Sequence, residues 1–170
     1  MRSTSAAAGS AVFFVIAPGT VAGVVPWSIT RWTVVPEVSG LWPTRFTGAV
    51  LIVAGIVLLV DCFVRFARDG LGTPAPILPT QHLVVGGVYR YVRNPMYVGV
   101  VSAILGQALY FVDLRLLEYG ALVWLAFHLF VLIYEEPTLK RTFGAEYETF
   151  RRNVPRWIPR LRPWNGETAG

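Results

Sequence analysis

The sequence predicts an all-α, polytopic membrane protein with about four transmembrane helices and a C-terminal amphipathic helix at the membrane surface. Three observations lead to this fold class. First, the 170 residues are 54% hydrophobic and only 15% charged, with a mean hydropathy of +0.52, whereas a soluble domain normally carries about a quarter charged residues. Second, the apolar residues gather into four long runs. Third, the segments between them are rich in Arg, Trp, Gly and Pro, which is typical of membrane interfaces and loops.

The four runs cover residues 6–29, 46–66, 95–112 and 116–134. At 1.5 Å per residue the second run reaches about 30 Å, the thickness of a bilayer core. The first run is also compatible with a signal peptide, but it is longer than a signal h-region and lacks a clear Ala-x-Ala cleavage site, so we favour a retained helix. The single domain then comprises helices one and two (1–66), a cytoplasmic loop (67–94), helices three and four (95–136), and an amphipathic helix with a tail (137–170).

The positive charges predict the orientation of these helices. With four spans, the N-terminus, residues 65–94 and the C-terminal tail lie on one side of the membrane. Only Arg31, Arg45 and Arg115 fall on the other side, so 12 of the 15 Lys+Arg residues share the first. By the positive-inside rule the shared side, with both termini, is cytoplasmic.

Composition also excludes several classes of function. The net charge of +5 is carried by arginines that flank apolar runs, which argues for topology and lipid contact rather than nucleic-acid binding. The single cysteine, Cys62, rules out a disulfide or a Cys-based metal site within one chain. Because an apolar site raises a thiol's pKa, Cys62 is expected to be a packing residue and not a nucleophile.

Spacing within the helices predicts how they pack. Small residues four apart, Gly99 and Ala103, with Ser102 and Gly106 offset, predict close approach of the third helix to a neighbour. Asp61 is expected to pair with Arg65 one turn later. In the C-terminal region an apolar stripe predicts a helix lying along the membrane surface. Its members are Leu139, Phe143, Tyr147, Phe150 and Val154.

One stretch, residues 86–99, combines glycines, tyrosines, arginines and an Asn-Pro pair directly before the third run. Asn94 is a good N-cap and Pro95 suits the first helical position, so a helix should begin there. Its free N–H groups, with Arg90 and Arg93, form a natural seat for an anion. The same features also suit the ordinary basic flank of a membrane helix.

Two acids, Glu135 and Glu136, end the fourth run and should meet this stretch, because a very short turn makes helices three and four antiparallel. Carboxylates at a helix C-terminus are unfavourable by up to about 1 kcal/mol each and need a cation. That cation is either Arg90, Arg93 or Lys140, or the ammonium of a ligand. A ligand with an ammonium, a carboxylate and a sulfonium for the tyrosine rings, such as S-adenosylmethionine, suits this residue set.

A resemblance to the integral-membrane methyltransferase superfamily is carried by three stretches in this order. They are residues 89–99 (Tyr-Arg-Tyr-Val-Arg-Asn-Pro-Met-Tyr-Val-Gly), 134–137 (Tyr-Glu-Glu-Pro) and 143–147 (Phe-Gly-Ala-Glu-Tyr). The superfamily includes isoprenylcysteine carboxyl methyltransferases and phospholipid N-methyltransferases. The likeness covers residues 83–159, close to half of the chain.

The resemblance implies a cytoplasm-facing S-adenosylmethionine site and methyl transfer to a lipid-like or prenylated acceptor delivered from the bilayer. It implies catalytic roles for Arg93, Asn94 and Glu136, although many members carry a histidine at the position of Asn94. The residues implied around the cofactor are Tyr89, Arg93, Pro95, Tyr97, Gly99, Glu135 and Glu136.

Other polar residues are weighed against simpler roles. Arg151 and Arg152 are candidate acceptor-binding residues, although a topological or lipid-facing role suits them better. His82 is a weaker candidate for a base. His128, in mid-helix, is expected to be a satisfied interhelical hydrogen-bonding residue.

Two other functions remain open. Sterol reductases resemble this superfamily in their C-terminal half and use NADPH, but they are much longer. A non-enzymatic membrane protein would keep the packing without the cofactor. The sequence leaves the acceptor, the choice between O- and N-methylation, and the oligomeric state undetermined.

Overall fold

In the computed structural model, residues 16–34, 40–68 and 83–166 are described, and this part of the chain is helical and contains no strand. The loop prolines at 74, 76 and 79, His82 and the start of the first apolar run lie outside the described residues. The elements in chain order are η1 (Thr20–Val24), α2 (Val25–Thr30), α3 (Trp42–Arg68), η2 (Gly87–Arg90), α4 (Pro95–Phe111), α5 (Leu114–Phe130), η3 (Val131–Glu135) and α6 (Glu136–Asn153).

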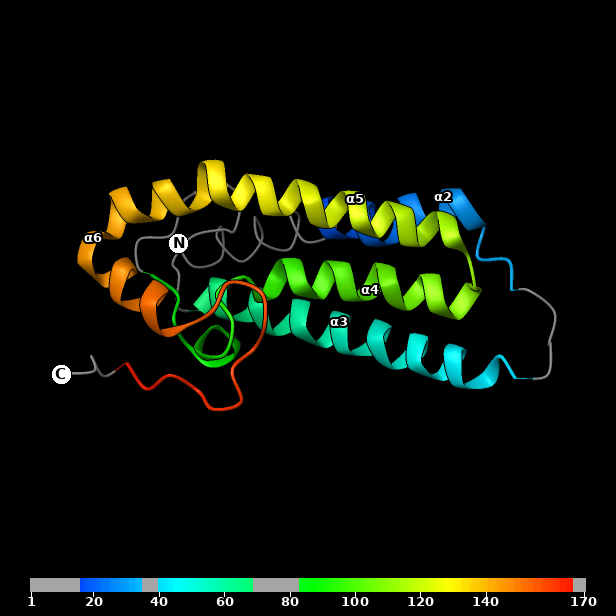
Figure 1. The fold of residues 1–170 in the computed structure, drawn as a ribbon, viewed down its shortest axis with the longest axis horizontal. Helices are drawn as coiled ribbons and strands as arrows, with labels where there is room; N and C mark the ends of the chain where they lie inside the picture. The colour runs from blue at the N-terminus through cyan, green and yellow to red at the C-terminus, as the bar shows by residue number, and fades with distance from the viewer. Residues whose placement is uncertain (1–15, 35–39, 69–82, 167–170) are drawn as a thin grey trace.

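Successive long helices run antiparallel to one another, and residues 87–94 and the C-terminal segment gather at the same end of the bundle (Figure 1). Two of the described helices, Trp42–Arg65 and Leu114–Asn153, are long and apolar enough to cross a membrane. Two more, Ile16–Thr30 and Pro95–Phe111, are apolar but shorter. The all-helical fold class is therefore confirmed, while the number of spans stays a prediction.

A glycine seam joins α3 to α4 and confirms the close packing predicted from small residues. A Cβ atom added to Gly55 would lie 2.6 Å from the carbonyl oxygen of Gly99, and one added to Gly106 would lie 2.7 Å from that of Gly48. These four glycines let the two backbones touch, because only a missing side chain leaves room for such an approach. Gly99 is buried in this seam.

The first helix, Ile16–Thr30, is attached to the rest of the bundle by polar side chains. Gln107 in α4 donates a hydrogen bond to the carbonyl of Ala22 at 2.7 Å. Tyr119 in α5 donates to the carbonyl of Val21 at 2.9 Å. The predicted ion pair between Asp61 and Arg65 is present at 2.8 Å.

The expectation that the fourth helix ends at Glu135 and Glu136 is wrong. The helix continues from Leu114 to Asn153, passing through the π-helical turn η3 directly before Pro137. The wider turn accommodates a residue that has no N–H to donate. The real break is at Gly144, whose φ of 53° suits glycine. The two acids therefore do not face a free helix C-terminus.

The apolar stripe of α6 exists, and it packs on the protein's own core, so the position of this helix at the membrane surface stays a prediction. Tyr147, Phe150 and Val154 are buried in a core cluster with Cys62 and Tyr89. Leu139 and Phe143 pack against the same cluster. The break at Gly144 folds the second half of α6 back over the end of the bundle (Figure 1), so the stripe faces the protein's own core. Cys62 is fully buried there, as expected of a packing residue.

Candidate functional site

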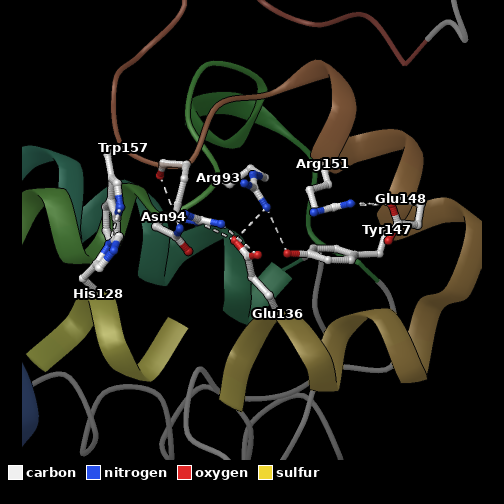
Figure 2. Close-up of polar contacts among 9 residues, drawn as sticks. Arg93, Asn94, His128, Glu136, Tyr147, Glu148, Arg151 and Trp157 are labelled. Carbon is white, nitrogen blue, oxygen red and sulfur yellow. Dashed lines mark hydrogen bonds and ion pairs between the residues drawn. The ribbon is translucent and has the colours of Figure 1, made fainter. Parts of the chain in front are cut away.

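An arginine-carboxylate cluster lies where η2, the start of α6 and the C-terminal segment converge (Figure 2). Glu136 accepts hydrogen bonds from Arg156 at 2.6 and 3.0 Å, one to each carboxylate oxygen. It also accepts one from Arg93 at 3.0 Å. The same nitrogen of Arg93 donates to the hydroxyl of Tyr147 at 3.0 Å. Glu136 is thus satisfied by two arginines.

Glu135, its neighbour, has a different environment. The hydroxyl of Tyr97 donates a hydrogen bond to Oε2 of Glu135 at 2.8 Å, and no arginine or lysine forms an ion pair with Glu135 among the described residues. Glu135 lines a cavity, whereas Glu136 does not. The two adjacent acids therefore differ in their ability to bind a further cation. The carboxylate of Glu136 is already paired with two arginines, whereas that of Glu135 accepts a hydrogen bond from Tyr97 and forms no such ion pair among the described residues.

The cavity, of about 160 Å³, lies between the first helix, the start of α4 and the end of the α5–η3 helix. Its wall combines charged, aromatic and apolar groups. The lining residues are Ala17, Pro18, Val21, Tyr89, Arg93, Asn94, Pro95, Met96, Tyr97, Val100, Phe127 and Glu135.

Two polar groups at this wall have unused hydrogen-bonding or charge-pairing capacity. Nε of Arg93 is buried and has no hydrogen-bond partner among the described residues, although burying such a donor is costly. On the other side Glu135 offers a carboxylate to a cation, and the rings of Tyr97 and Phe127 lie 4.6 Å apart between centroids. No group of His, Cys, Asp and Glu side chains in the described part of the chain is arranged for a metal.

The C-terminal segment closes the cluster with main-chain hydrogen bonds to residues 90–93. The N–H of Arg93 donates to the carbonyl of Pro155 at 2.9 Å. The N–H groups of Arg160 and Trp164 donate to the carbonyls of Tyr91 and Arg90 at 2.9 and 3.0 Å. Residues 153–165 therefore line the η2 loop and hold Arg156 over Glu136.

Asn94 and Arg90 act differently from the expectations. Asn94 stands at the N-cap position of α4, but its side chain forms no capping bond; it is buried and donates to the carbonyl of Arg156 at 3.3 Å. Arg90 donates instead to the carbonyl of Trp164 and to the side chain of Asn165. Lys140 pairs with Glu148 instead. Of the three candidate cations, only Arg93 reaches the acid pair.

The remaining candidates fall into two groups. Tyr89, Arg93, Pro95 and Tyr97 lie together at the cavity with Glu135. Gly99, by contrast, lies in the α3–α4 seam and is not among the residues that line the cavity.

Arg151 and Arg152 are exposed, and Arg151 pairs with Glu148 (Figure 2). Burial raises the pKa of Tyr89 well above its ordinary value, so its hydroxyl stays neutral.

Sequence reasoning missed Arg156 and Tyr147 as partners of the cluster. Arg156 follows the predicted amphipathic helix by only a few residues, and its bond to Glu136 raises its pKa. His128 was correctly expected to be satisfied: its Nδ1 accepts a hydrogen bond from Nε1 of Trp157 at 3.1 Å. The partner lies in the C-terminal segment and not in another helix.

Comparison with known proteins identifies the family to which this chain belongs. The phospholipid methyltransferase family matches residues 43–146, which is more than half of the chain. The chain belongs to this family and is a membrane methyltransferase.

Curated relatives agree with this assignment. The probable protein-S-isoprenylcysteine O-methyltransferase of Oryza sativa subsp. indica is 28% identical over 77% of this chain and 69% of its own length. The protein-S-isoprenylcysteine O-methyltransferase of Schizosaccharomyces pombe is 38% identical over 45% of this chain and 33% of its own length. Protein-S-isoprenylcysteine O-methyltransferase B of Arabidopsis thaliana is 28% identical over 69% of this chain and 60% of its own length. No solved structure matches the chain.

Proposed function

We propose that the protein transfers a methyl group from S-adenosylmethionine to a membrane-borne acceptor with an apolar tail, the first candidate being the carboxylate of a prenylated cysteine. The observation that carries the proposal is a cavity lined by both Arg93 and Glu135, a guanidinium and a carboxylate that has no arginine or lysine partner among the described residues. The names of the curated relatives support the acceptor class.

Different cavity residues would bind different charged groups of the cofactor. Arg93 would attract the carboxylate of the cofactor by its positive charge, while its Nη1 stays with Glu136 and Tyr147. Glu135 would accept the ammonium, and Tyr97 holds that carboxylate in place. The aromatic faces of Tyr97 and Phe127 favour a nearby sulfonium by cation–π attraction. Glu136 acts indirectly, because it fixes Arg93.

Bound S-adenosylmethionine would supply a methyl group whose bond to sulfur breaks as the acceptor oxygen bonds to carbon, leaving a methyl ester and a neutral thioether. A carboxylate acceptor is already ionised at neutral pH, so the chain needs no general base and contributes mainly position and desolvation. His128 suits this view, because its Nδ1 already accepts a hydrogen bond. An amine acceptor would first have to lose a proton.

The membrane arrangement belongs to the same proposal. Four spans, made by the first helix, α3, α4 and α5, would put residues 87–97 and the C-terminal segment on the cytoplasmic side. The antiparallel order of the helices and the excess of arginines at that end support this topology (Figure 1). An acceptor anchored in the inner leaflet would then meet the cavity at the membrane surface.

Calorimetric binding of S-adenosylmethionine, its demethylated product and NADPH to detergent-purified protein tests the proposal. We expect saturable binding of the first two, at least about tenfold weaker in Glu135→Gln, which replaces the one acidic side chain among the described residues that line the cavity. Glu136→Gln should also weaken binding, but by less, since it acts through Arg93. Binding of NADPH alone would favour the reductase. Absence of all three from folded protein would leave a non-enzymatic membrane protein.

A further inference from the structure

The C-terminal segment carries the two most exposed large apolar side chains in the described part of the chain. Leu161 is 99% exposed and Ile158 is 78% exposed, and both follow the last helix. A single exposed leucine on a protein surface needs no explanation. The depth of this pair in the membrane and the charges around it are what make it informative.

The outer face of α3 shows where the hydrocarbon core of the membrane ends. This face is a row of exposed apolar side chains that begins at Phe46 and ends at Val64. The row is about 27 Å long at 1.5 Å per residue, which is close to the bilayer core of about 30 Å. Arg65, paired with Asp61, comes directly after it. The guanidinium of Arg65 therefore marks the level of the lipid headgroups.

Contacts of η2 place the C-terminal segment at this same level. Gly87 packs so closely against the guanidinium of Arg65 that a Cβ atom would not fit. A few residues later, the carbonyl of Tyr91 accepts a hydrogen bond from the N–H of Arg160 at 2.9 Å. The C-terminal segment, drawn in red, forms the margin of the molecule at this end of the bundle (Figure 1). Residues 158–162 thus lie beside the headgroups and not far out in water.

The segment is also strongly basic. Residues 151–165 contain five arginines and no acid. Arg156 is paired within the buried cluster, and Arg160 donates to the carbonyl of the residue after Arg152 at 2.6 Å, which holds the end of α6 beside the segment. Arg152 and Arg162 are exposed and form no ion pair among the described residues. Two guanidinium groups are therefore available beside the two apolar side chains.

We propose that Ile158, Leu161, Arg152 and Arg162 form a docking surface for the anionic phospholipids of the cytoplasmic leaflet. The two apolar side chains enter the boundary between headgroups and acyl chains, and the two guanidinium groups bind lipid phosphates. The cytoplasmic leaflet carries anionic lipid, which matches the sign of the segment. The inference rests on the proposed membrane arrangement and not on the methyl donor.

A fluorophore at residue 161 tests where this side chain lies. Cys62 is fully buried, so Leu161→Cys supplies the reactive thiol for an environment-sensitive label. The labelled chain is placed in nanodiscs of phosphatidylcholine, alone or mixed equally with phosphatidylglycerol, with a doxyl-labelled lipid as quencher. We expect quenching at least about twofold stronger in the mixed bilayer. Thr142→Cys, exposed in the part of α6 that extends beyond η2 (Figure 1), should be quenched weakly in both bilayers.

Removal of the two available arginines tests the contribution of charge. Arg152→Gln combined with Arg162→Gln should lower the quenching of the residue 161 label in the mixed bilayer to its level in phosphatidylcholine alone. The matched control, Arg141→Gln combined with Arg151→Gln, removes the same charge from exposed positions of α6 outside the docking surface. This control should keep the difference between the two bilayers.

A second label, at Val57→Cys on the exposed face of α3, reports the membrane arrangement separately. If this label is quenched and the one at residue 161 is not, α3 crosses the bilayer and the docking surface is overturned. If neither is quenched, the membrane arrangement fails and the docking surface with it. Equal quenching of residue 161 in both bilayers, unchanged by the arginine substitutions, overturns the anionic-lipid site. A blue-shifted emission without quenching, growing with the ratio of protein to lipid, would assign the surface to a second copy of the chain.

Discussion

The glycine seam between α3 and α4 and the Arg93–Glu136–Arg156 cluster are both buried, but they are stabilised in opposite ways. The seam depends on missing side chains: at Gly55 and Gly106 the neighbouring backbone leaves no room for a Cβ. The cluster depends on side chains that must all be present, because each charge in it is compensated by the others. Added volume should therefore damage the first region, and lost charge the second.

The largest effect is expected from Gly55→Leu. The new side chain would meet the backbone of Gly99 and Ala103, which cannot move aside as a flexible side chain can. We expect the free energy of unfolding to fall by about 3 kcal/mol, near the upper end of overpacking costs. Thermal unfolding in detergent measures this change. Val57→Leu, at a position that is 62% exposed on the same helix, is the control; equal melting of both variants would show that the seam is not tightly packed.

A smaller effect is expected from Arg156→Gln. Glu136 would keep Arg93 but lose two short hydrogen bonds, at a cost of about 1–3 kcal/mol in unfolding free energy. Arg156→Lys should recover only part of this loss, because an ammonium cannot donate to both carboxylate oxygens as a planar guanidinium does. The exposed Arg162 in the same segment provides the control, Arg162→Gln. Full stability in Arg156→Gln would mean that the cluster does not secure the C-terminal segment.

The smallest effect is expected from Lys140→Ala. Lys140 pairs with Glu148, but its side chain is 64% exposed, and Glu148 keeps a second partner in Arg151. Exposed pairs of this kind contribute little. The melting temperature and the affinity for S-adenosylmethionine should match those of wild-type protein. A clearly lower melting temperature or affinity would contradict this prediction, because it would show that the exposed Lys140–Glu148 pair contributes as the buried cluster does.

The same contrast explains what sequence reasoning achieved. The seam was predictable because Gly99, Ala103 and Gly106 lie on one helix, where periodicity alone defines a face. The pairing of Arg93 with Glu136 was also within reach, since a short turn makes α4 and α5 antiparallel. Arg156 and Tyr147 were not identified as partners, because several arginines compete for the same acids and spacing cannot rank contacts made by a distant segment.

The packing of helix α6 on the core was not predicted, for a related reason. Its apolar stripe was recognised correctly, but a stripe does not specify whether lipid or protein covers it. Gly144 decides the matter, since its left-handed backbone folds Tyr147 and Phe150 onto the core. Glu135 and Glu136 were expected at the negative end of a helix because Pro137 suggested that the helix ends there. Instead, a π-helical turn lets the helix continue through Pro137.

The main-chain bonds between residues 90–93 and the C-terminal segment have a consequence for biosynthesis. A ribosome releases Pro155, Arg160 and Trp164 only after every helix that they bridge. During translation, α3, α4 and α5 are synthesised while Glu136 still lacks Arg156 and the η2 loop still lacks its main-chain partners in residues 155–164. The Arg93–Glu136–Arg156 cluster is therefore completed only after all the described helices have been synthesised, because Arg156 follows the last of them.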